Sequence, residues 1–191
     1  MFSCVYKCVS VPHKKMGVLY TTLSQLYWRF SEPRMILVCG LDNAGKTSLV
    51  NHLRGLKMPT VLTLGFNADV VDLGIAKFSM FDVCGQDTRR TMWPMFFAHA
   101  HALIYVVDSN DLSRLYESGQ EFLKIRKHPQ FPDIPMLVLA NKQDESRAST
   151  PAQVMRAMRL DNEARPWHVC GTAIRDGEGV DSGLQWLSLQ V

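Results

Sequence analysis

Residues 38–48 read Val38-Cys39-Gly40-Leu41-Asp42-Asn43-Ala44-Gly45-Lys46-Thr47-Ser48, and this pattern sets the expected architecture of the whole chain. It matches G-x-x-x-x-G-K-[ST], a loop between a strand and a helix whose backbone N–H groups surround a di- or triphosphate. In such a loop Lys46 reaches the β- and γ-phosphates, and the Thr47 hydroxyl is a ligand for Mg²⁺. Apolar residues predict a buried strand over 35–38 and a helix over 47–53. The loop therefore predicts a nucleotide site without choosing between ATP and GTP.

The composition is that of an ordinary globular domain. A length of 191 residues suits one α/β domain with a sizeable core. The formal charge of +3 is too small and too dispersed to favour nucleic acid as a partner, although a mild attraction to anionic lipid remains open. The five cysteines have no metal-binding spacing, which predicts a reducing, intracellular setting. No apolar run reaches the length of about 18 residues that indicates a membrane span.

The N-terminal segment divides into two parts. Residues 1–16 carry no periodic pattern and are predicted to be a disordered extension. Residues 17–32 place apolar side chains on one helical face, which predicts an amphipathic helix that packs on the domain or lies in a membrane interface. Met16-Gly17-Val18-Leu19-Tyr20-Thr21 fits M-G-x-x-x-[ST], so Gly17 is an N-myristoylation candidate if translation starts at Met16. Residues 33–191 are expected to form the single globular domain.

The remaining chain alternates between strand and helix patterns. Two strands are predicted over 66–73 and 75–81, joined as a tight hairpin. Continuous apolar runs over 103–107 and 135–140 predict strands buried on both faces. A last strand is predicted over 167–172, and helices are predicted over 112–126, from Thr150 onward and over 180–189. This order predicts a doubly wound, mostly parallel sheet of six strands with one antiparallel edge strand, and a ligand at the carboxyl ends of the strands.

Three short motifs follow predicted strands and face the same edge of that sheet. In Asp82–Gln86, Asp82 can hold Mg²⁺ through water, the Gly85 N–H can reach a γ-phosphate, and Gln86 can orient the attacking water. In Asn141–Asp144, the Asp144 carboxylate can accept hydrogen bonds from N1–H and the exocyclic amine of guanine. Adenine has an acceptor at N1, so this pairing selects GTP over ATP. Thr172–Ile174 offers backbone N–H groups to the guanine oxygen.

With these motifs the chain resembles the Ras-like small GTPases, and within them the Arf and Arf-like branch. The resemblance covers roughly residues 17–191. It rests on residues 40–47, 63–67, 85–87, 107–111, 141–144 and 186–187. Phe81-Asp82, Pro166–Cys170 and Gly177–Gly179 resemble the ciliary Arf-like members that recruit the Bardet–Biedl coat, the BBSome. Leu62 departs from the proline that the family usually carries before its switch threonine.

The resemblance implies a set of residue roles. Thr63 becomes the switch threonine that ligates Mg²⁺ in the GTP form, and the catalytic residues are Gln86, Lys46 and Thr63. The metal ligands are Thr47, Thr63 and, through water, Asp82. Phe66, Phe81 and Phe96 match the positions that present the GTP-state surface to effectors. The nucleotide-binding residues are Asp42, Asn43, Ala44, Gly45, Lys46, Thr47, Ser48, Thr63, Gly85, Asn141, Lys142, Asp144, Thr172, Ala173 and Ile174.

The expected activity is a GTP-binding switch that hydrolyses GTP slowly. Asp42 stands where faster Ras-like enzymes have glycine, and its carboxylate is expected to crowd Gln86. The resemblance implies GTP or GDP and Mg²⁺ as cofactors and a monomer. It also implies an exchange factor, a GTPase-activating protein and a BBSome-like coat as partners. The expected location is cytoplasmic, peripheral on membrane in the GTP form, and at the base of a cilium. Another Arf-like trafficking role, a non-hydrolysing scaffold and a P-loop ATPase or kinase stay open, the last disfavoured by Asp144.

Overall fold

The computed structural model describes residues 5–7, 34–55, 66–72, 77–83 and 93–191. Its centre is one seven-stranded sheet with the strand order β1-β7-β6-β5-β2-β4-β3. The five inner strands β7, β6, β5, β2 and β4 are parallel, whereas β1 and β3 pair antiparallel at the two edges. The strands are β1 (Val5–Lys7), β2 (Arg34–Cys39), β3 (Phe66–Asp72), β4 (Lys77–Val83), β5 (Ala102–Asp108), β6 (Met136–Asn141) and β7 (Trp167–Gly171).

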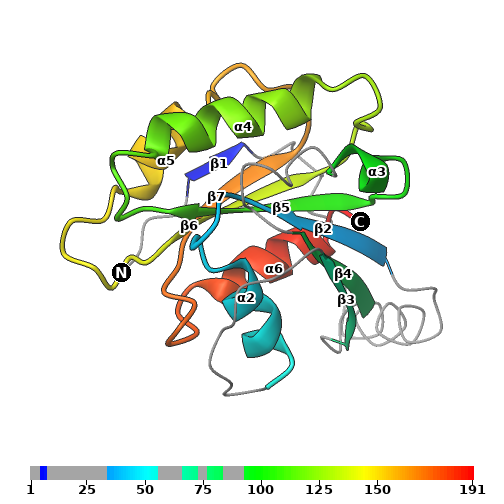
Figure 1. The fold of residues 1–191 in the computed structure, drawn as a ribbon, viewed down its shortest axis with the longest axis horizontal. Coiled ribbons are helices and arrows are strands. Elements are labelled where there is room, and N and C mark those ends of the chain that lie inside the picture. Colours follow the sequence, from blue (N-terminus) through cyan, green and yellow to red (C-terminus); the bar gives the residue numbers. More distant parts are fainter. Residues whose placement is uncertain (1–4, 8–33, 56–65, 73–76, 84–92) are drawn as a thin grey trace, which may run out of the picture.

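Helices cover both faces of this sheet (Figure 1). On one face lie α3, α4 and α5, and on the other lie α2 and α6. The helices are α2 (Lys46–Leu53), α3 (Pro94–Phe97), α4 (Leu115–Lys127), α5 (Pro151–Ala157) and α6 (Val180–Ser188). The doubly wound α/β class predicted from the alternating strand and helix patterns is confirmed.

Successive residues of the inner strands enter two separate hydrophobic cores. Leu37 and Tyr105 pack with Phe122 under α4, whereas the neighbouring residues Val38 and Ile104 pack on the opposite face. This division follows from the two-residue side-chain period of a strand. Because helices cover both faces, β5 and β6 are apolar almost throughout, as expected for parallel strands without a solvent face.

The sheet has one more strand than the sequence predicted, and therefore two antiparallel edges instead of one. Val5–Lys7 lies in the segment predicted to be disordered, yet it pairs with β7 from Trp167 to Val169. Valine and tyrosine favour strands, and pairing covers an otherwise open sheet edge. A run of three residues is too short to carry a periodic signal. The rest of the predicted extension, 1–4 and 8–16, and the predicted helix over 17–32 lie outside the described residues.

The start of α4 also differs from the prediction, which placed it at Leu112. Asp111 accepts hydrogen bonds from the Ser113 hydroxyl at 2.7 Å and from the Arg114 N–H at 3.2 Å. These bonds hold residues 111–114 in a turn, so α4 begins at Leu115. The predicted start of α5 is confirmed, because Thr150 and Gln153 form a reciprocal capping box ahead of Pro151.

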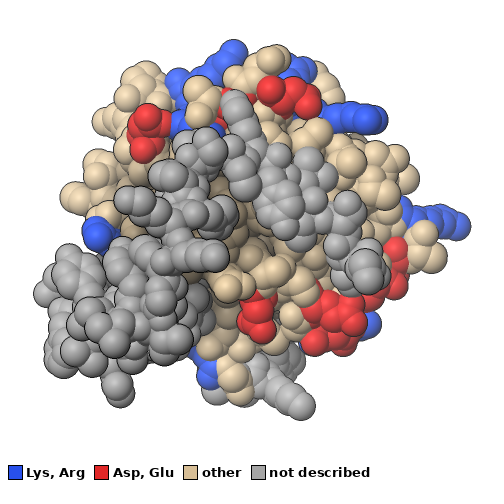
Figure 2. Space-filling view, turned by 180° about the vertical axis from the view of Figure 1, so that it is seen from behind, with Lys and Arg blue, Asp and Glu red and all other residues tan. Residues whose placement is uncertain are grey.

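The described surface carries charges of both signs. In Figure 2, Lys and Arg side chains lie beside Asp and Glu along the rim of the face seen from behind, without a single large basic patch among the residues described there. None of the helices in the described ranges is both long and apolar enough to cross a membrane.

Candidate functional site

The glycine-rich loop is built tightly against its neighbours. Gly40 has φ = 141°, and a Cβ atom at this position would lie 2.2 Å from the Val106 carbonyl oxygen of β5. Gly45 has φ = 106°, and a Cβ atom there would lie 2.4 Å from Asn141 Nδ2. No side chain other than glycine fits these two positions without strain. Helix α2 starts directly afterwards, and the Leu49 N–H donates to the Gly45 carbonyl at 2.9 Å.

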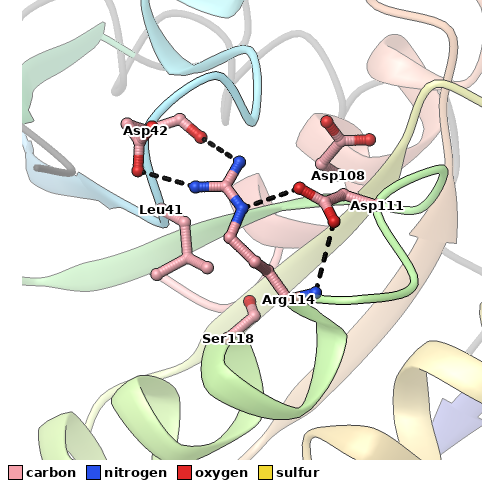
Figure 3. Close-up of a pocket in the computed structure, with 6 residues that line it drawn as sticks. All are labelled: Leu41, Asp42, Asp108, Asp111, Arg114 and Ser118. Atoms are coloured by element: carbon pink, nitrogen blue, oxygen red, sulfur yellow. Dashed lines mark hydrogen bonds and ion pairs between the residues drawn. The ribbon is translucent and has the colours of Figure 1, made fainter.

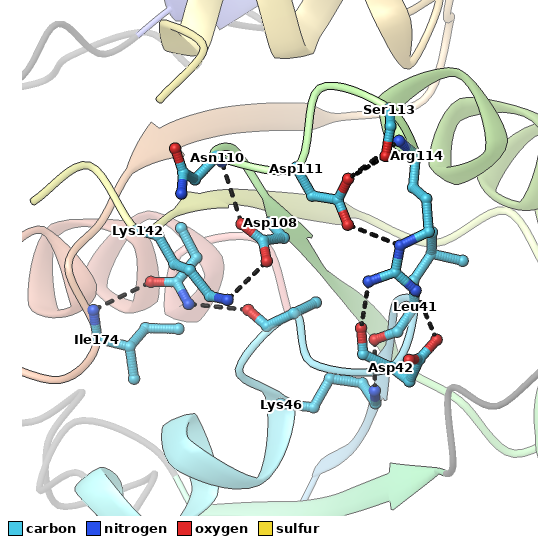
Figure 4. Close-up of polar contacts among 12 residues, drawn as sticks. Leu41, Asp42, Lys46, Asp108, Asn110, Asp111, Ser113, Arg114, Lys142 and Ile174 are labelled. Carbon is cyan, nitrogen blue, oxygen red and sulfur yellow. Dashed lines mark hydrogen bonds and ion pairs between the residues drawn. The ribbon is translucent and has the colours of Figure 1, made fainter. Parts of the chain in front are cut away.

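Lys46 points back into the loop that precedes it. Its side chain is buried, with the residue 6 % exposed, and Nζ donates to the Leu41 carbonyl oxygen at 2.9 Å (Figure 4). A buried ammonium at the centre of such a loop is positioned to meet phosphate oxygens. Thr47 and Ser48 follow on the first turn of α2 and are half-buried.

Asn141 connects the glycine-rich loop to the loop after the last strand. Its Nδ2 donates to the Ala44 carbonyl at 2.8 Å, and its Oδ1 accepts from the Ile174 N–H at 3.1 Å. The Thr172 hydroxyl lies 3.4 Å from the same oxygen. The residue is 4 % exposed, so these are buried hydrogen bonds. The sequence-based expectation that the ends of β2, β6 and β7 meet at one place is therefore confirmed.

Lys142 is held by a carboxylate that the motif analysis did not pair with it. Its Nζ lies 2.6 Å from Asp108 Oδ2 at the end of β5, and Asp108 Oδ1 accepts from the Asn110 N–H at 3.0 Å. Lys142 itself adopts a left-handed backbone conformation with φ = 65°. The ion pair sets the path of the loop between β6 and Asp144.

Asp144 lies beside Arg175, which follows the last strand. Arg175 Nη2 donates to Asp144 Oδ2 at 3.0 Å, with side-chain exposures of 76 % for the arginine and 23 % for the aspartate. The Gln143 N–H donates to the Thr172 carbonyl at 3.0 Å, which fastens the two loops together. One oxygen of the carboxylate thus has a cationic partner from the chain.

The backbone of 172–174 is arranged differently from the prediction. The sequence predicted that this stretch offers backbone N–H groups to the guanine oxygen. In the structure the Thr172 N–H donates to the Ala140 carbonyl at 3.0 Å, the Ala173 N–H to the Glu178 carbonyl at 3.0 Å, and the Ile174 N–H to Asn141 Oδ1 at 3.1 Å. These bonds close the loop on itself and on β6. The three buried residues consequently form the wall of the site rather than a row of open donors.

Asp42 is held to one side by a residue that sequence reasoning missed. Arg114 Nη1 lies 2.9 Å from Asp42 Oδ1, while Arg114 Nε lies 2.7 Å from Asp111 Oδ2 (Figures 3 and 4). The hydrogen bond from the Ser113 hydroxyl, followed by that from Arg114, lowers the pKa of the Asp111 carboxyl. The hydrogen bond to Asp111 is in turn the largest cause of the raised pKa of Arg114. The Asp111 carboxylate and the Arg114 guanidinium therefore both stay charged throughout the neutral pH range.

The cavity in Figure 3 lies between the glycine-rich loop and the start of α4. Its volume of about 10 Å³ is the size of a single water site. It is therefore a small gap between packed residues and is too small to hold a nucleotide. Its lining residues are Leu41, Asp42, Asp108, Asp111, Arg114 and Ser118.

The described residues fit a magnesium ion that is shared with a phosphate ligand. The β2–β4 register places Asp82 beside Val38, close to the start of the glycine-rich loop, and Thr47 is the second residue of α2 at the end of that loop. Hydroxyl and carboxylate oxygens are ligands that Mg²⁺ prefers, and it usually completes its shell with water and substrate oxygens. Within the described ranges no three His, Cys, Asp or Glu side chains form a dedicated metal cage. The described cysteines, Cys39 and Cys170, are both buried.

Several predicted site residues lie outside the described residues. These are Gly17, Thr63, Gly85 and Gln86. Of the three predicted effector positions, Phe66 and Phe81 lie on the paired strands β3 and β4, and Phe96 lies on α3. Phe96 packs partly buried against the core, while its neighbour Met95 is 71 % exposed.

Comparison with known proteins identifies the family. The model of the "ADP-ribosylation factor family" (Arf) matches residues 19–191. The chain belongs to this family. ADP-ribosylation factor 3 of Arabidopsis thaliana and ADP-ribosylation factor 1 of Brassica rapa subsp. pekinensis are each 38 % identical over 175 residues, which cover 91 % of this chain and 96 % of each relative. Among solved structures, the Arl6 BBS3 small GTPase from Trypanosoma brucei, with the bound nucleotide analogue GppNp, is 30 % identical at a TM-score of 0.76. That match covers 84 % of this chain and 100 % of the other.

This Arf-family chain is a GTP-binding switch and a GTPase. The sequence-based recognition of an Arf-like small GTPase is confirmed. In its structure the loops after β2, β6 and β7 lie together, and buried hydrogen bonds of Lys46 and Asn141 hold them there.

Proposed function

We propose that this Arf-family chain recruits a coat or effector complex to a membrane when it holds GTP, in vesicular or ciliary protein trafficking. The nucleotide site is proposed to consist of the glycine-rich loop, Asn141–Asp144 and Thr172–Ile174, with Thr63 and Gly85 contacting the γ-phosphate. The observation that carries this assignment is Asn141, whose buried amide joins the loops after β2 and β7 at 2.8 and 3.1 Å.

In this site the chain's own residues orient the substrate. Lys46 is proposed to offset phosphate charge, and the Asp144 carboxylate, which is 23 % exposed, is proposed to accept from the guanine N–H groups. Thr47, Thr63 and Asp82 would hold Mg²⁺, which supplies charge neutralisation to the phosphates when bound. Gln86 is proposed to orient the attacking water, and hydrolysis without a partner is proposed to be slow. A GTPase-activating protein that supplies an arginine would then raise the rate roughly 10³- to 10⁵-fold.

The proposed membrane and partner roles belong to two parts of the chain, the N-terminal segment and a set of three phenylalanines. Residues 17–32 are proposed as the amphipathic helix that enters the membrane in the GTP form, with Gly17 as the lipidated residue. Phe66, Phe81 and Phe96 are proposed as the effector surface, with Phe66 and Phe81 on the paired strands β3 and β4 and Phe96 on α3. An exchange factor is the third partner. We propose a peripheral, cytoplasmic location for the protein.

A BBSome-like coat at the base of a cilium is the effector that we favour. The support is the similarity to the Arl6 BBS3 GTPase of Trypanosoma brucei, together with Pro166–Cys170 and Gly177–Gly179 in the sequence. The alternative is an Arf-like trafficking role without a ciliary connection, which the 38 % identity to plant ADP-ribosylation factors supports.

A capture experiment tests this function and separates the two effectors. Gln86→Leu protein, locked in the GTP form, and Thr47→Asn protein, impaired in GTP-state metal binding, would be coupled to beads and exposed to extract from ciliated cells. We expect the Gln86→Leu protein alone to retain BBSome subunits. Retention of a different coat would favour the non-ciliary role, and equal retention by both variants would contradict a GTP-dependent switch. Measurable phosphate release from wild type with a matched activator would exclude a non-hydrolysing scaffold.

A further inference from the structure

Asp42 is an unfavourable residue at the place where it lies. Lys46 Nζ donates to the carbonyl of Leu41, the residue immediately before Asp42. Asp42 therefore lies in the part of the glycine-rich loop that Lys46 Nζ contacts. That lysine meets β- and γ-phosphates in loops of this kind. A carboxylate beside a triphosphate repels it, and the repulsion is greater for a triphosphate than for a diphosphate because the third phosphate adds negative charge.

Arg114 counters this charge with a well-anchored guanidinium. Its Nη1 lies 2.9 Å from Asp42 Oδ1, and its Nη2 lies 3.5 Å from the Asp42 carbonyl oxygen. Its Nε lies 2.7 Å from Asp111 Oδ2, so a second carboxylate holds the guanidinium plane in place. The side chains of Asp42 and Arg114 are 37 % and 32 % exposed, so water screens the pair only in part.

The direction of these contacts matters as much as their charge. Figure 4 shows the Asp42 side chain turned toward Arg114 at the start of α4, while Lys46 Nζ reaches the carbonyl of the neighbouring Leu41. The carboxylate is therefore directed toward the Arg114 guanidinium at the start of α4. Removal of Arg114 takes this cation away from the Asp42 carboxylate, whose negative charge then opposes a γ-phosphate more strongly.

We infer that Arg114 is a positioning residue that sets the preference of this site for GTP over GDP by holding the Asp42 carboxylate against α4. The inference rests on the assignment of the glycine-rich loop as the phosphate site. It assigns the effect to the triphosphate end of the nucleotide and leaves the guanine end unchanged. In this inference Asp111 fixes the orientation of the Arg114 guanidinium through its hydrogen bond with Nε.

The test compares the affinities of fluorescent GDP and fluorescent GppNHp, with Mg²⁺ present, for wild type and variants. Arg114→Ala is expected to lower the affinity ratio of GppNHp to GDP by roughly two- to fivefold, the range of a partly exposed ion pair. Arg114→Lys keeps the charge and is expected to restore most of the ratio. With Asp42→Asn in the background, Arg114→Ala is expected to leave the ratio unchanged, because no carboxylate remains to be held.

The matched control is Arg156→Ala, which removes an exposed arginine from α5. It is expected to leave the ratio at the wild-type value. If Arg114→Ala does not yield folded protein, Arg114→Gln replaces it and the same outcomes apply. The inference is overturned if the ratio does not change, or if the loss persists with Asp42→Asn, since a structural role would weaken both nucleotides in either background. Wild type that binds neither nucleotide would overturn the site assignment as well.

Discussion

Asn141 joins two loops of the proposed site. Its amide satisfies the Ala44 carbonyl on one side and the Ile174 N–H on the other, and the residue is almost fully buried. No water can replace these bonds without a cavity for it. The side chain therefore determines whether the phosphate and base ends of the site keep a common geometry.

We expect Asn141→Ala to lower the free energy of unfolding by about 1–3 kcal/mol, because it leaves two buried backbone groups without a partner. Dissociation of GDP is expected to accelerate by at least about tenfold, since the loops that enclose the nucleotide are no longer joined. Chemical denaturation and release of fluorescent GDP measure the two effects. Asn162→Ala, at an exposed position, is the control. Unchanged GDP release in the Asn141 variant would contradict this role.

At this scale sequence reasoning finds residue types but not their partners. The identities of Lys46, Asn141 and Asp144 follow from motif spacing, because a phosphate or a base demands particular groups at particular strand ends. The pairing of Arg114 with Asp42 joins residues 72 positions apart and has no local signal. The same holds for the N–H groups of 172–174, since a sequence cannot tell whether a loop donor faces a ligand or the chain itself.

Among the elements, the end of α4 is tied to the loop before β7 by a buried ion network. Glu163 Oε2 accepts from Arg126 Nη1 at 2.7 Å, and Glu163 Oε1 accepts from Arg165 Nε at 2.9 Å. The Arg126 side chain is 7 % exposed and also donates to the Met158 and Arg159 carbonyls at 3.2 Å. Helix α4 is thus joined to the end of α5 and to the approach of β7, on the side of the fold away from the site.

This network predicts a specific loss of stability in acid. Burial raises the pKa of the Glu163 carboxyl, but hydrogen bonds and charge from Arg165 and Arg126 outweigh it and lower that pKa to about 2 from 4.5. The unfolded chain therefore takes up this proton first as the pH falls. The stability that the carboxylate supplies is complete above pH 4.5 and is lost between about pH 4.5 and 2.

We expect Glu163→Gln to lower the free energy of unfolding at pH 7 by about 3 kcal/mol, because Arg126 remains buried without its carboxylate. Between pH 4.5 and 2 the variant is expected to lose less stability than wild type, since Glu163 no longer titrates there. Urea unfolding over a pH series measures both. Glu121→Gln breaks a pair with Lys124, whose side chain is 71 % exposed, and is expected to cost under about 1 kcal/mol. Parallel pH curves for wild type and Glu163→Gln would rule out the network.

Element boundaries were predictable where a local rule applies and not elsewhere. The capping box at Thr150 sets the start of α5 from four residues alone. Helix α4 starts later than its apolar pattern suggests, because Asp111 holds the preceding turn with polar bonds that periodicity does not register. Strand β1 depends on the open edge of β7, a feature of the assembled sheet and not of residues 5–7.

Over the whole molecule, the proposed site exists only when the sheet is assembled. Residues from the ends of β2, β6 and β7 meet there, although 97 positions separate Ala44 from Asn141 in the chain. An unfolded chain cannot present such a site, so a nucleotide binds the folded state alone. Binding must therefore raise the stability of the entire domain by mass action. The temperature of unfolding becomes a readout of base recognition at Asp144.

At a GDP concentration about 100 times its Kd, wild type is expected to gain about 2.7 kcal/mol, which for a domain of this size is roughly 5–10 °C in Tm. ADP is expected to give no shift, because adenine has no N1–H for the Asp144 carboxylate. Asp144→Asn offers one donor and one acceptor, which match the N1–H and O2 of xanthine. We therefore expect this variant to lose the GDP shift and to gain one with xanthosine diphosphate. Asp176→Asn, which changes the other carboxylate beside Arg175, is expected to keep the wild-type response. A GDP shift that survives Asp144→Asn would place the base elsewhere in the molecule.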